Sequence, residues 1–256
     1  MLTVTSLRRC TGFVYVLAVI FVMATYFGAT GCSNGAPQAL VFPVVKALEP
    51  DLSQGATVKG HVRYEGAAPT PSMRTNADPW CKSQGHKIFD ESLVVKDGKL
   101  ANVFVHVVKG LEAYAFDHDK TERVINQQGC VFVPHVVGIQ THQPVRFTND
   151  DATSHNVNTL TSKTGQGVSV STTGRGTFKV VQFPKAEFMM RGVCDVHANM
   201  LMYMHVVPHP YFAVTQADGE WTFPRKLPPG TYTLEFLHEY LGKRESVITV
   251  TPGTES

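Results

Sequence analysis

A cysteine, a histidine and two methionines lie close together near residue 200. The segment reads Cys194-Asp195-Val196-His197-Ala198-Asn199-Met200-Leu201-Met202, between two stretches with the pattern of strands. A thiolate, an imidazole and thioethers held together suit a soft metal, copper above all. A trigonal copper site of this kind needs two imidazoles, one thiolate and a weak axial thioether. We therefore expect a second histidine to come from elsewhere in the chain.

His155 is the candidate for that second imidazole. It follows a predicted strand in the segment Val145-Arg146-Phe147-Thr148-Asn149-Asp150-Asp151-Ala152-Thr153-Ser154-His155-Asn156-Val157. This segment resembles the cupredoxins (plastocyanins, pseudoazurins and amicyanins), in which a V-x-F-x-N-x-D strand leads to H-N-V. In that family C-x-x-H follows some forty residues later, as Cys194 and His197 do here. The resemblance covers roughly residues 124–207.

The resemblance implies one type 1 copper ion held by His155, Cys194 and His197. It also implies that Asn156 ties the two ligand loops together. For the axial ligand, plastocyanins and pseudoazurins favour Met202, which we take as the prediction. A C-x-x-H-x-x-M pattern close to that of the purple-copper oxidase subunits favours Met200 as the alternative. The second cysteine of a dinuclear purple site is absent, so one ion is expected.

The other cysteines restrict the pairing. The chain has five cysteines: Cys10 precedes an N-terminal apolar run at 12–28, and Cys32 follows that run. Unpaired thiols are uncommon in secreted proteins. If Cys194 binds metal, Cys81 and Cys130 remain to form a disulfide. The alternative is that Cys194 is a buried free thiol, or that it pairs with Cys81 or Cys130.

The N-terminus has the anatomy of a secretory signal. Arg8 and Arg9 precede an uncharged apolar run at 12–28, and small residues end it. Gly31-Cys32 resembles a bacterial lipoprotein box, which implies cleavage after residue 31 and acylation of Cys32. We therefore predict a signal peptide at 1–31 and a lipoprotein held at a membrane in the periplasm or at the outer membrane. Ordinary cleavage with free secretion is the alternative.

Charge and composition argue against a nucleic-acid partner. Without residues 1–31, the chain has 21 basic and 21 acidic side chains, and its sequence contains no basic run. A net charge near zero gives no electrostatic attraction to a phosphate backbone. At 43% hydrophobic and 17% charged, the chain has the composition of a globular protein.

The predicted fold class is all-β: a Greek-key, cupredoxin-like β-sandwich with additional flanking strands. Short strands recur every eight to twelve residues with turn residues between them, and no amphipathic helix is evident. We divide the chain into a tether at 32–54, a β segment at 55–121, a cupredoxin-like part at 122–208 and a last segment at 209–256. The last segment contains Asp218-Gly219-Glu220-Trp221 and Leu227-Pro228-Pro229-Gly230, which resemble the transthyretin-like (carboxypeptidase regulatory-like) modules. Whether one or two β domains result stays open.

The resemblance implies single-electron transfer to a transient redox partner, with His197 as an exposed exit in an apolar rim of Ala198, Met200 and Met202. A second hypothesis is copper handling without fast electron transfer, suggested by Met and His residues along the exit strand (Met200, Met202, Met204, His205 and His209). A third is a structural module at the cell surface. An enzyme is not expected, since no nucleophile–base pair, phosphate loop or carboxylate pair stands out.

Overall fold

The computed structural model describes residues 48–74, 78–85 and 87–252, which belong to one compact unit. Within these residues strands dominate, and the one helix is α1 (Pro79–Ser83), so the predicted all-β fold class is confirmed. No helix of the described part is long and apolar enough to cross a bilayer. The predicted signal peptide 1–31, the lipidation site Cys32 and most of the tether 32–54 lie outside the described residues.

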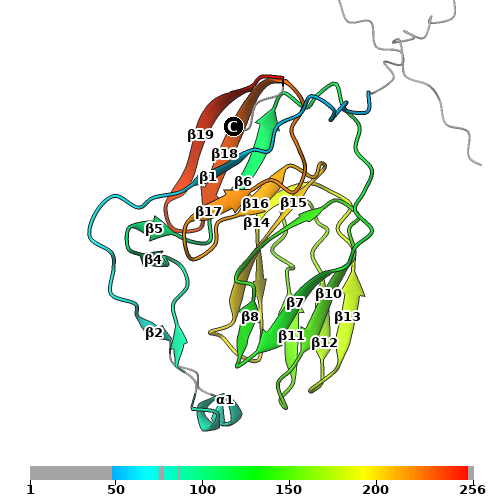
Figure 1. Cartoon of the computed structure of the whole chain (residues 1–256). Helices are drawn as coiled ribbons and strands as arrows, with labels where there is room; N and C mark the ends of the chain where they lie inside the picture. Colours follow the sequence, from blue (N-terminus) through cyan, green and yellow to red (C-terminus); the bar gives the residue numbers. More distant parts are fainter. Residues whose placement is uncertain (1–47, 75–77, 86, 253–256) are drawn as a thin grey trace, which may run out of the picture. The chain divides into compact units, whose positions relative to one another are not determined.

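Two sheets form the sandwich (Figure 1). The first has the order β13-β10-β7-β8, from β13 (Phe178–Val181), β10 (Val145–Asn149), β7 (Arg123–Gln128) and β8 (Val131–Val133). The second has the order β12-β11-β14-β15-β9, from β12 (Ser169–Thr172), β11 (His155–Asn158), β14 (Glu187–Val193), β15 (Leu201–Val207) and β9 (Val136–Gln140). Each contains one parallel pair, β10–β7 and β15–β9, and the other pairs are antiparallel.

The core of the sandwich follows from residue alternation along the strands. In β10, Val145 and Phe147 are buried, whereas Arg146 and Thr148 between them are partly exposed. Alternate side chains point to opposite faces of a strand. Buried residues of both sheets, such as Ile125 from β7 and Met204 from β15, therefore belong to one hydrophobic cluster.

A third sheet is built from segments that precede and follow the sandwich in sequence. Its order is β16-β6-β18-β19, from β16 (Phe212–Val214), β6 (Phe104–Lys109), β18 (Gly230–His238) and β19 (Gly242–Val250). A short pair, β1 (Lys59–His61) with β17 (Glu220–Thr222), again joins the two segments. A second hydrophobic cluster contains residues of both, including Val105, Trp221 and Leu234. The segments 55–121 and 209–256 thus share a sheet and a core.

Gly138 lies where the third sheet packs on the sandwich. A Cβ at this position in β9 would collide with the rings of Phe104 and Phe212. Phe104 also belongs to a small buried cluster with Val136, Val207 and Leu237, which unites β6, β9, β15 and β18. The absence of a side chain at residue 138 lets two aromatic rings lie directly on the β9 backbone.

Two local predictions differ from the structure. The Asp97-Gly98 sequence predicts a hairpin turn between strands at 92–95 and 103–108, but in the structure this turn joins the two-residue strands β4 (Val95–Lys96) and β5 (Lys99–Leu100). Both turn residues have positive φ, as a tight hairpin requires. The Pro-, Asn- and Asp-rich sequence of 67–90 predicts a long loop, but this segment contains α1 and the pair β2 (Met73–Arg74) with β3 (Ile88–Phe89).

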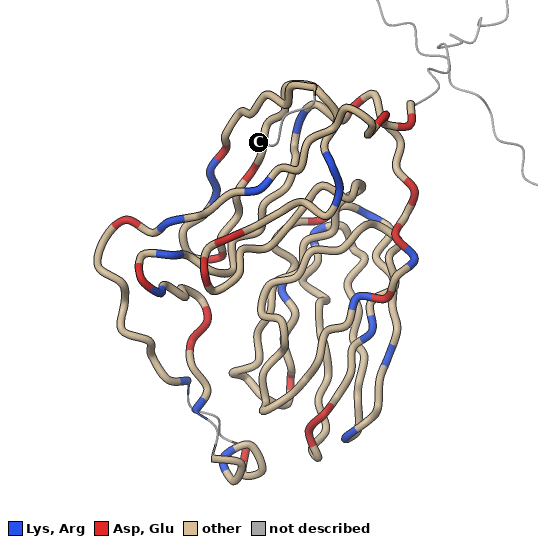
Figure 2. The backbone as a smooth tube through the Cα atoms, in the orientation of Figure 1, with Lys and Arg blue, Asp and Glu red and all other residues tan. Residues whose placement is uncertain are grey.

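Charged residues are interspersed by sign along the described backbone (Figure 2). One of them, Glu187 in β14, is 5% exposed. Its carboxylate accepts hydrogen bonds from Ser162 Oγ and Thr164 Oγ1, both at 2.5 Å, and from Lys163 N at 2.7 Å. Burial opposes ionisation, but these donors outweigh it and lower the pKa of Glu187 to about 2. Glu187 therefore fastens the connection between β11 and β12 to the sandwich.

We predict that Glu187→Gln destabilises the protein at neutral pH by about 3 kcal/mol, because the ionised carboxylate satisfies several donors at once. A lowered pKa in the folded state stabilises the protein above the usual range near 4.5. This contribution should fall away as the pH drops from 4.5 towards 2. Urea unfolding at pH 7 and pH 3 measures both effects. Glu122→Gln is the control, since Glu122 pairs with Arg146 at the surface and should change stability by less than about 1 kcal/mol. An equal loss at both pH values would contradict the prediction.

Candidate metal centre

His155 is the first residue of β11, and the loop before it is fixed by side-chain hydrogen bonds. Asn149, the last residue of β10, accepts from Asp151 N at 2.8 Å and donates to Thr153 O at 2.8 Å. These bonds turn the chain back so that β11 starts beside β12 and β14. His155 is 1% exposed.

Cys194 and His197 lie in the loop between β14 and β15. Met200 N donates to His197 O at 2.9 Å, and Cys194 N donates to Met200 O at 3.4 Å. The Asn156 side chain bridges to this loop, accepting from Asp195 N at 2.8 Å and donating to Asp195 Oδ2 at 2.7 Å. The expected role of Asn156 in joining the ligand loops is confirmed.

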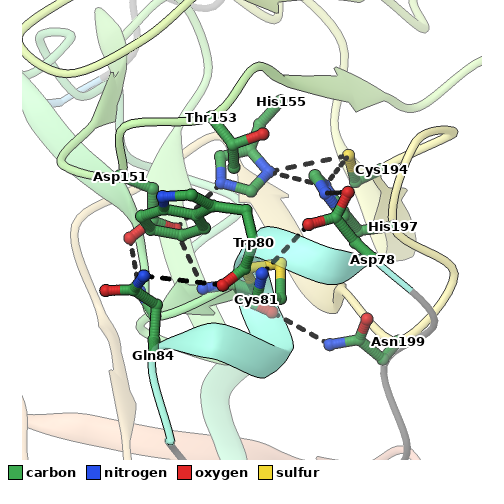
Figure 3. Close-up of a disulfide and its surroundings, with 12 residues drawn as sticks. Asp78, Trp80, Cys81, Gln84, Asp151, Thr153, His155, Cys194, His197 and Asn199 are labelled. Carbon is green, nitrogen blue, oxygen red and sulfur yellow. Dashed lines mark hydrogen bonds and ion pairs between the residues drawn. A yellow bond between two sulfur atoms is a disulfide. The ribbon is translucent and has the colours of Figure 1, made fainter.

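The structure brings the three predicted ligand residues together (Figure 3). His155 Nδ1 lies 2.9 Å from His197 Nδ1, and Cys194 Sγ lies 4.0 Å and 3.6 Å from these two nitrogens. A point within this triangle is about 2 Å from all three atoms, close to usual metal bonds to imidazole nitrogen and thiolate sulfur. All three residues are buried. The donor set and its spacing therefore fit a copper ion.

The local electrostatics favour a thiolate at Cys194. Burial raises the pKa of the thiol, but hydrogen bonds with His155 and with backbone N–H groups outweigh this effect and lower it. Burial likewise opposes protonation of His155, yet its contacts with Asp151 and Cys194 raise its pKa to about 8. Burial and the neighbouring positive His155 lower the pKa of His197. A thiolate at Cys194 and a neutral imidazole at His197 are the states that metal binding requires, whereas His155 has to release its proton when a metal binds.

Asp151 supports His155 from behind. Its Oδ2 lies 2.9 Å from His155 Nε2 and also accepts from Cys130 N at 2.9 Å, while Oδ1 accepts from Gly129 N at 2.8 Å. Gly129 and Cys130 form the two-residue turn between β7 and β8, both with positive φ. Asp151 is the aspartate of the V-x-F-x-N-x-D motif, but its contact with His155 was not predicted from the sequence.

Of the two candidate methionines, Met202 lies on the inner face of β15, and Met200 is the residue just before that strand. Along the β14–β15 ladder, Met190 pairs with Met204 and Gly192 pairs with Met202. Met202 covers Gly192, where a Cβ would meet its side chain. The next step brings Met200 opposite Cys194, as their backbone hydrogen bond shows. Both methionines are buried at 1% or less.

A short segment covers the other side of the site. The structure contains the predicted disulfide between Cys81 and Cys130, which fastens α1 to the β7–β8 turn. Trp80 packs against the sandwich core, and Asp78 Oδ2 lies 3.5 Å from His197 Nε2. Asp78 followed by Pro79 is a typical helix start, and α1 begins at these residues.

Because α1 and Asp78 lie over this side of the site, the expectation of an exposed electron exit at His197 is wrong. His197 is 1% exposed and Met200 and Met202 are buried, so of the expected rim only Ala198 is exposed, together with Val196 at 61%. Met204, His205 and His209 are buried as well and do not form an exposed row. His205 stacks on Phe104 at a ring distance of 4.0 Å, and His209 Nε2 contacts Val107 O at 2.9 Å.

Comparison with known proteins gave only partial likenesses. No family model and no curated protein matches the chain. A copper-containing nitrite reductase from Thermus scotoductus SA-01 is 19% identical, with a TM-score of 0.32, over 40% of this chain and 25% of that one. An oxidised amicyanin variant is 15% identical over 36% of this chain and 88% of its own, and a reduced variant is 13% identical over 40% and 97%, both with a TM-score of 0.30. This chain thus matches a quarter of the nitrite reductase, and the copper assignment depends on its own donor atoms.

We predict that Asp151→Asn lowers the unfolding free energy of the metal-free protein by about 1–3 kcal/mol, because buried N–H donors lose a charged acceptor. Chemical denaturation measures the change. Asp150→Asn is the matched control: the neighbouring carboxylate is exposed and bonds Asn126 at 2.6 Å, so its loss should cost less. Equal effects of the two variants would contradict the role of Asp151.

Proposed function

We propose that this protein is a type 1 copper protein that carries single electrons. The observation that carries the proposal is the buried convergence of His155 Nδ1, Cys194 Sγ and His197 Nδ1. Two imidazoles and one thiolate are the equatorial donors of blue-copper sites. A copper ion bound there would supply one-electron Cu(II)/Cu(I) chemistry.

The protein's contribution is a rigid donor set. His155 is held by Asp151, the Cys194 loop is held by Asn156, and Cys194 Sγ lies 3.5 Å from Asn156 N. Hydrogen bonds at the sulfur and a buried, water-poor surrounding are the features that set the potential of such a centre. Donors fixed in this way need little rearrangement when the charge of the metal changes.

The predicted visible spectrum tests this proposal. Residues 33–256 loaded with Cu(II) should show an intense thiolate-to-copper band towards the red end, and Cys194→Ser should abolish it. Val193→Ala, which leaves the thiol in place, is the control and should keep the band. Wild-type protein that takes up Cu(II) without this band would overturn the electron-carrier proposal.

For the axial position we propose Met200 in preference to Met202. The support is the ladder register, in which Met200 lies opposite Cys194 and Met202 lies over Gly192. Met200→Leu should therefore shift the copper spectrum and raise the reduction potential, since a thioether is lost. Met202→Leu should leave both unchanged and cost less than about 1.5 kcal/mol of stability as a volume-conserving swap. The reverse result would assign Met202, the ligand predicted from the sequence.

A second candidate function is copper binding without fast electron transfer. The segment of Asp78 and α1 lies over His197, so the imidazole edge of this histidine is not exposed. This arrangement favours copper binding without fast electron transfer. Stopped-flow reduction of the Cu(II) protein by a small anionic reductant distinguishes the two functions. Slow reduction in spite of an intense thiolate band would favour copper handling.

For location and partners, we propose export by the N-terminal segment, acylation at Cys32 and transient docking to a redox protein at a membrane. The support is the sequence pattern Ala29-Thr30-Gly31-Cys32 after an apolar run. Mass spectrometry of the protein purified from membranes would detect the lipid on Cys32.

A further inference from the structure

One carboxylate, that of Asp78, serves both α1 and the metal site. Its Oδ1 accepts from Cys81 N at 3.0 Å and so caps the N-terminus of α1. Its Oδ2 lies 3.5 Å from Nε2 of His197. The position of Asp78 relative to His197 is therefore fixed by the helix that it begins.

The ring nitrogen of His197 that faces Asp78 needs an acceptor. His197 Nε2 is buried and makes no hydrogen bond within the described chain. When Nδ1 serves a metal, the proton of the neutral imidazole is on Nε2. A buried N–H without an acceptor is costly, and a carboxylate behind a ligating histidine fixes its tautomer and orientation. Asp78 is the carboxylate in the position to do this.

The other histidine has the same arrangement at closer range. Asp151 Oδ2 lies 2.9 Å from His155 Nε2. Both imidazoles therefore have an aspartate on the side away from Cys194 (Figure 3).

The disulfide joins these two aspartates. Cys130 holds Asp151 through its backbone N–H, and it holds α1 through the bond to Cys81. Its carbonyl accepts from Asn199 Nδ2 at 3.0 Å, which adds a contact with the Cys194–Met200 loop. Without the disulfide, α1 would lose its cross-link to the ligand-bearing sandwich and would be joined to it only along the main chain.

We propose that Asp78 is a positioning residue for the metal centre. It accepts a hydrogen bond from His197 Nε2–H, directs Nδ1 at the metal and stabilises Cu(II) relative to Cu(I) through its negative charge, and the Cys81–Cys130 disulfide keeps it in place. This inference rests on the proposed copper function.

The test is the Cu(II)/Cu(I) reduction potential of Asp78→Ser. Serine preserves the helix cap but is too short to reach His197. Loss of a carboxylate behind a ligand costs about 10-fold or more in metal affinity. If only the affinity for Cu(II) falls, the reduction potential rises by about 59 mV for each tenfold loss of affinity. Asp218→Ser is the matched control, since Asp218 caps Glu220 N at the surface and should leave the potential unchanged. An unchanged potential in Asp78→Ser would overturn the proposal.

A second arm tests the disulfide. The paired substitution Cys81→Ala with Cys130→Ala should raise the potential as Asp78→Ser does, because α1 is released from the site. Adding Asp78→Ser to that pair should then cause little further change, which is the non-additivity expected of residues that act through one contact. Fully additive shifts would show that the disulfide does not act through Asp78 and would overturn that part of the proposal.

A third arm needs no copper. Imidazole-optimised ¹H–¹⁵N spectra of the metal-free protein should show the His197 Nε2 proton in wild type, and Asp78→Ser should shift it or lose it to exchange. The His155 Nε2 proton, which faces Asp151, should stay in place as the internal control. If the wild type binds no copper, the proposed function fails while this readout still tests the contact. Identical His197 signals in both proteins would overturn the contact itself.

Discussion

The hydrogen bonds between the Asp151 carboxylate and the Gly129–Cys130 turn are the contacts on which the metal site depends most. They fix the end of the β7–β8 hairpin in the first sheet against the loop that delivers His155 to the second sheet. The same turn supplies Cys130 to the disulfide and so determines where α1 lies. Since a buried carboxylate is tolerated only when it is well hydrogen-bonded, moving the turn would cost stability as well as ligand geometry.

Burying the donor atoms costs free energy of solvation, and hydrogen bonds from the surrounding polar groups offset this cost. The chain places two imidazoles, a thiol and an aspartate in a site that is almost fully removed from solvent. Asn149 and Asn156 bond backbone groups of the ligand loops, and Asn199 donates to the Cys130 carbonyl of the β7–β8 turn. A polar network of this kind is rigid when its members are satisfied. Within the described residues of this network, two buried atoms have no hydrogen-bond partner: Asn199 Oδ1, and His197 Nε2, which lies beside Asp78.

Sequence reasoning succeeded where the signal is local. Alternation and turn residues predicted an all-β chain of short strands, and the resemblance carried by the motifs around His155, Cys194 and His197 implied a cluster that the structure forms. It failed where the signal depends on distant segments. Nothing near residue 78 in the sequence indicates that this aspartate lies against His197, because the contact spans 119 positions and depends on a disulfide. The exposed imidazole edge of His197 was implied by the cupredoxin resemblance. That resemblance gives no indication of a segment such as α1 lying over this histidine. The position of Met200 opposite Cys194 follows from the register of β14 with β15, which the sequence alone does not determine.

The third sheet has a consequence for the order in which the chain can fold. Strand β6 precedes the sandwich, and its partners β16 and β18 follow it more than a hundred residues later. The ligand-bearing strands therefore lie inside a loop that closes only when β16 and β18 pair with β6. Because ordering such a long loop is entropically unfavourable until many contacts form, the sandwich can assemble early in this sequence of events and present β9 as a surface for the outer layer. Gly138 has no side chain, so Phe104 of β6 and Phe212 of β16 can then pack on the β9 backbone at this position.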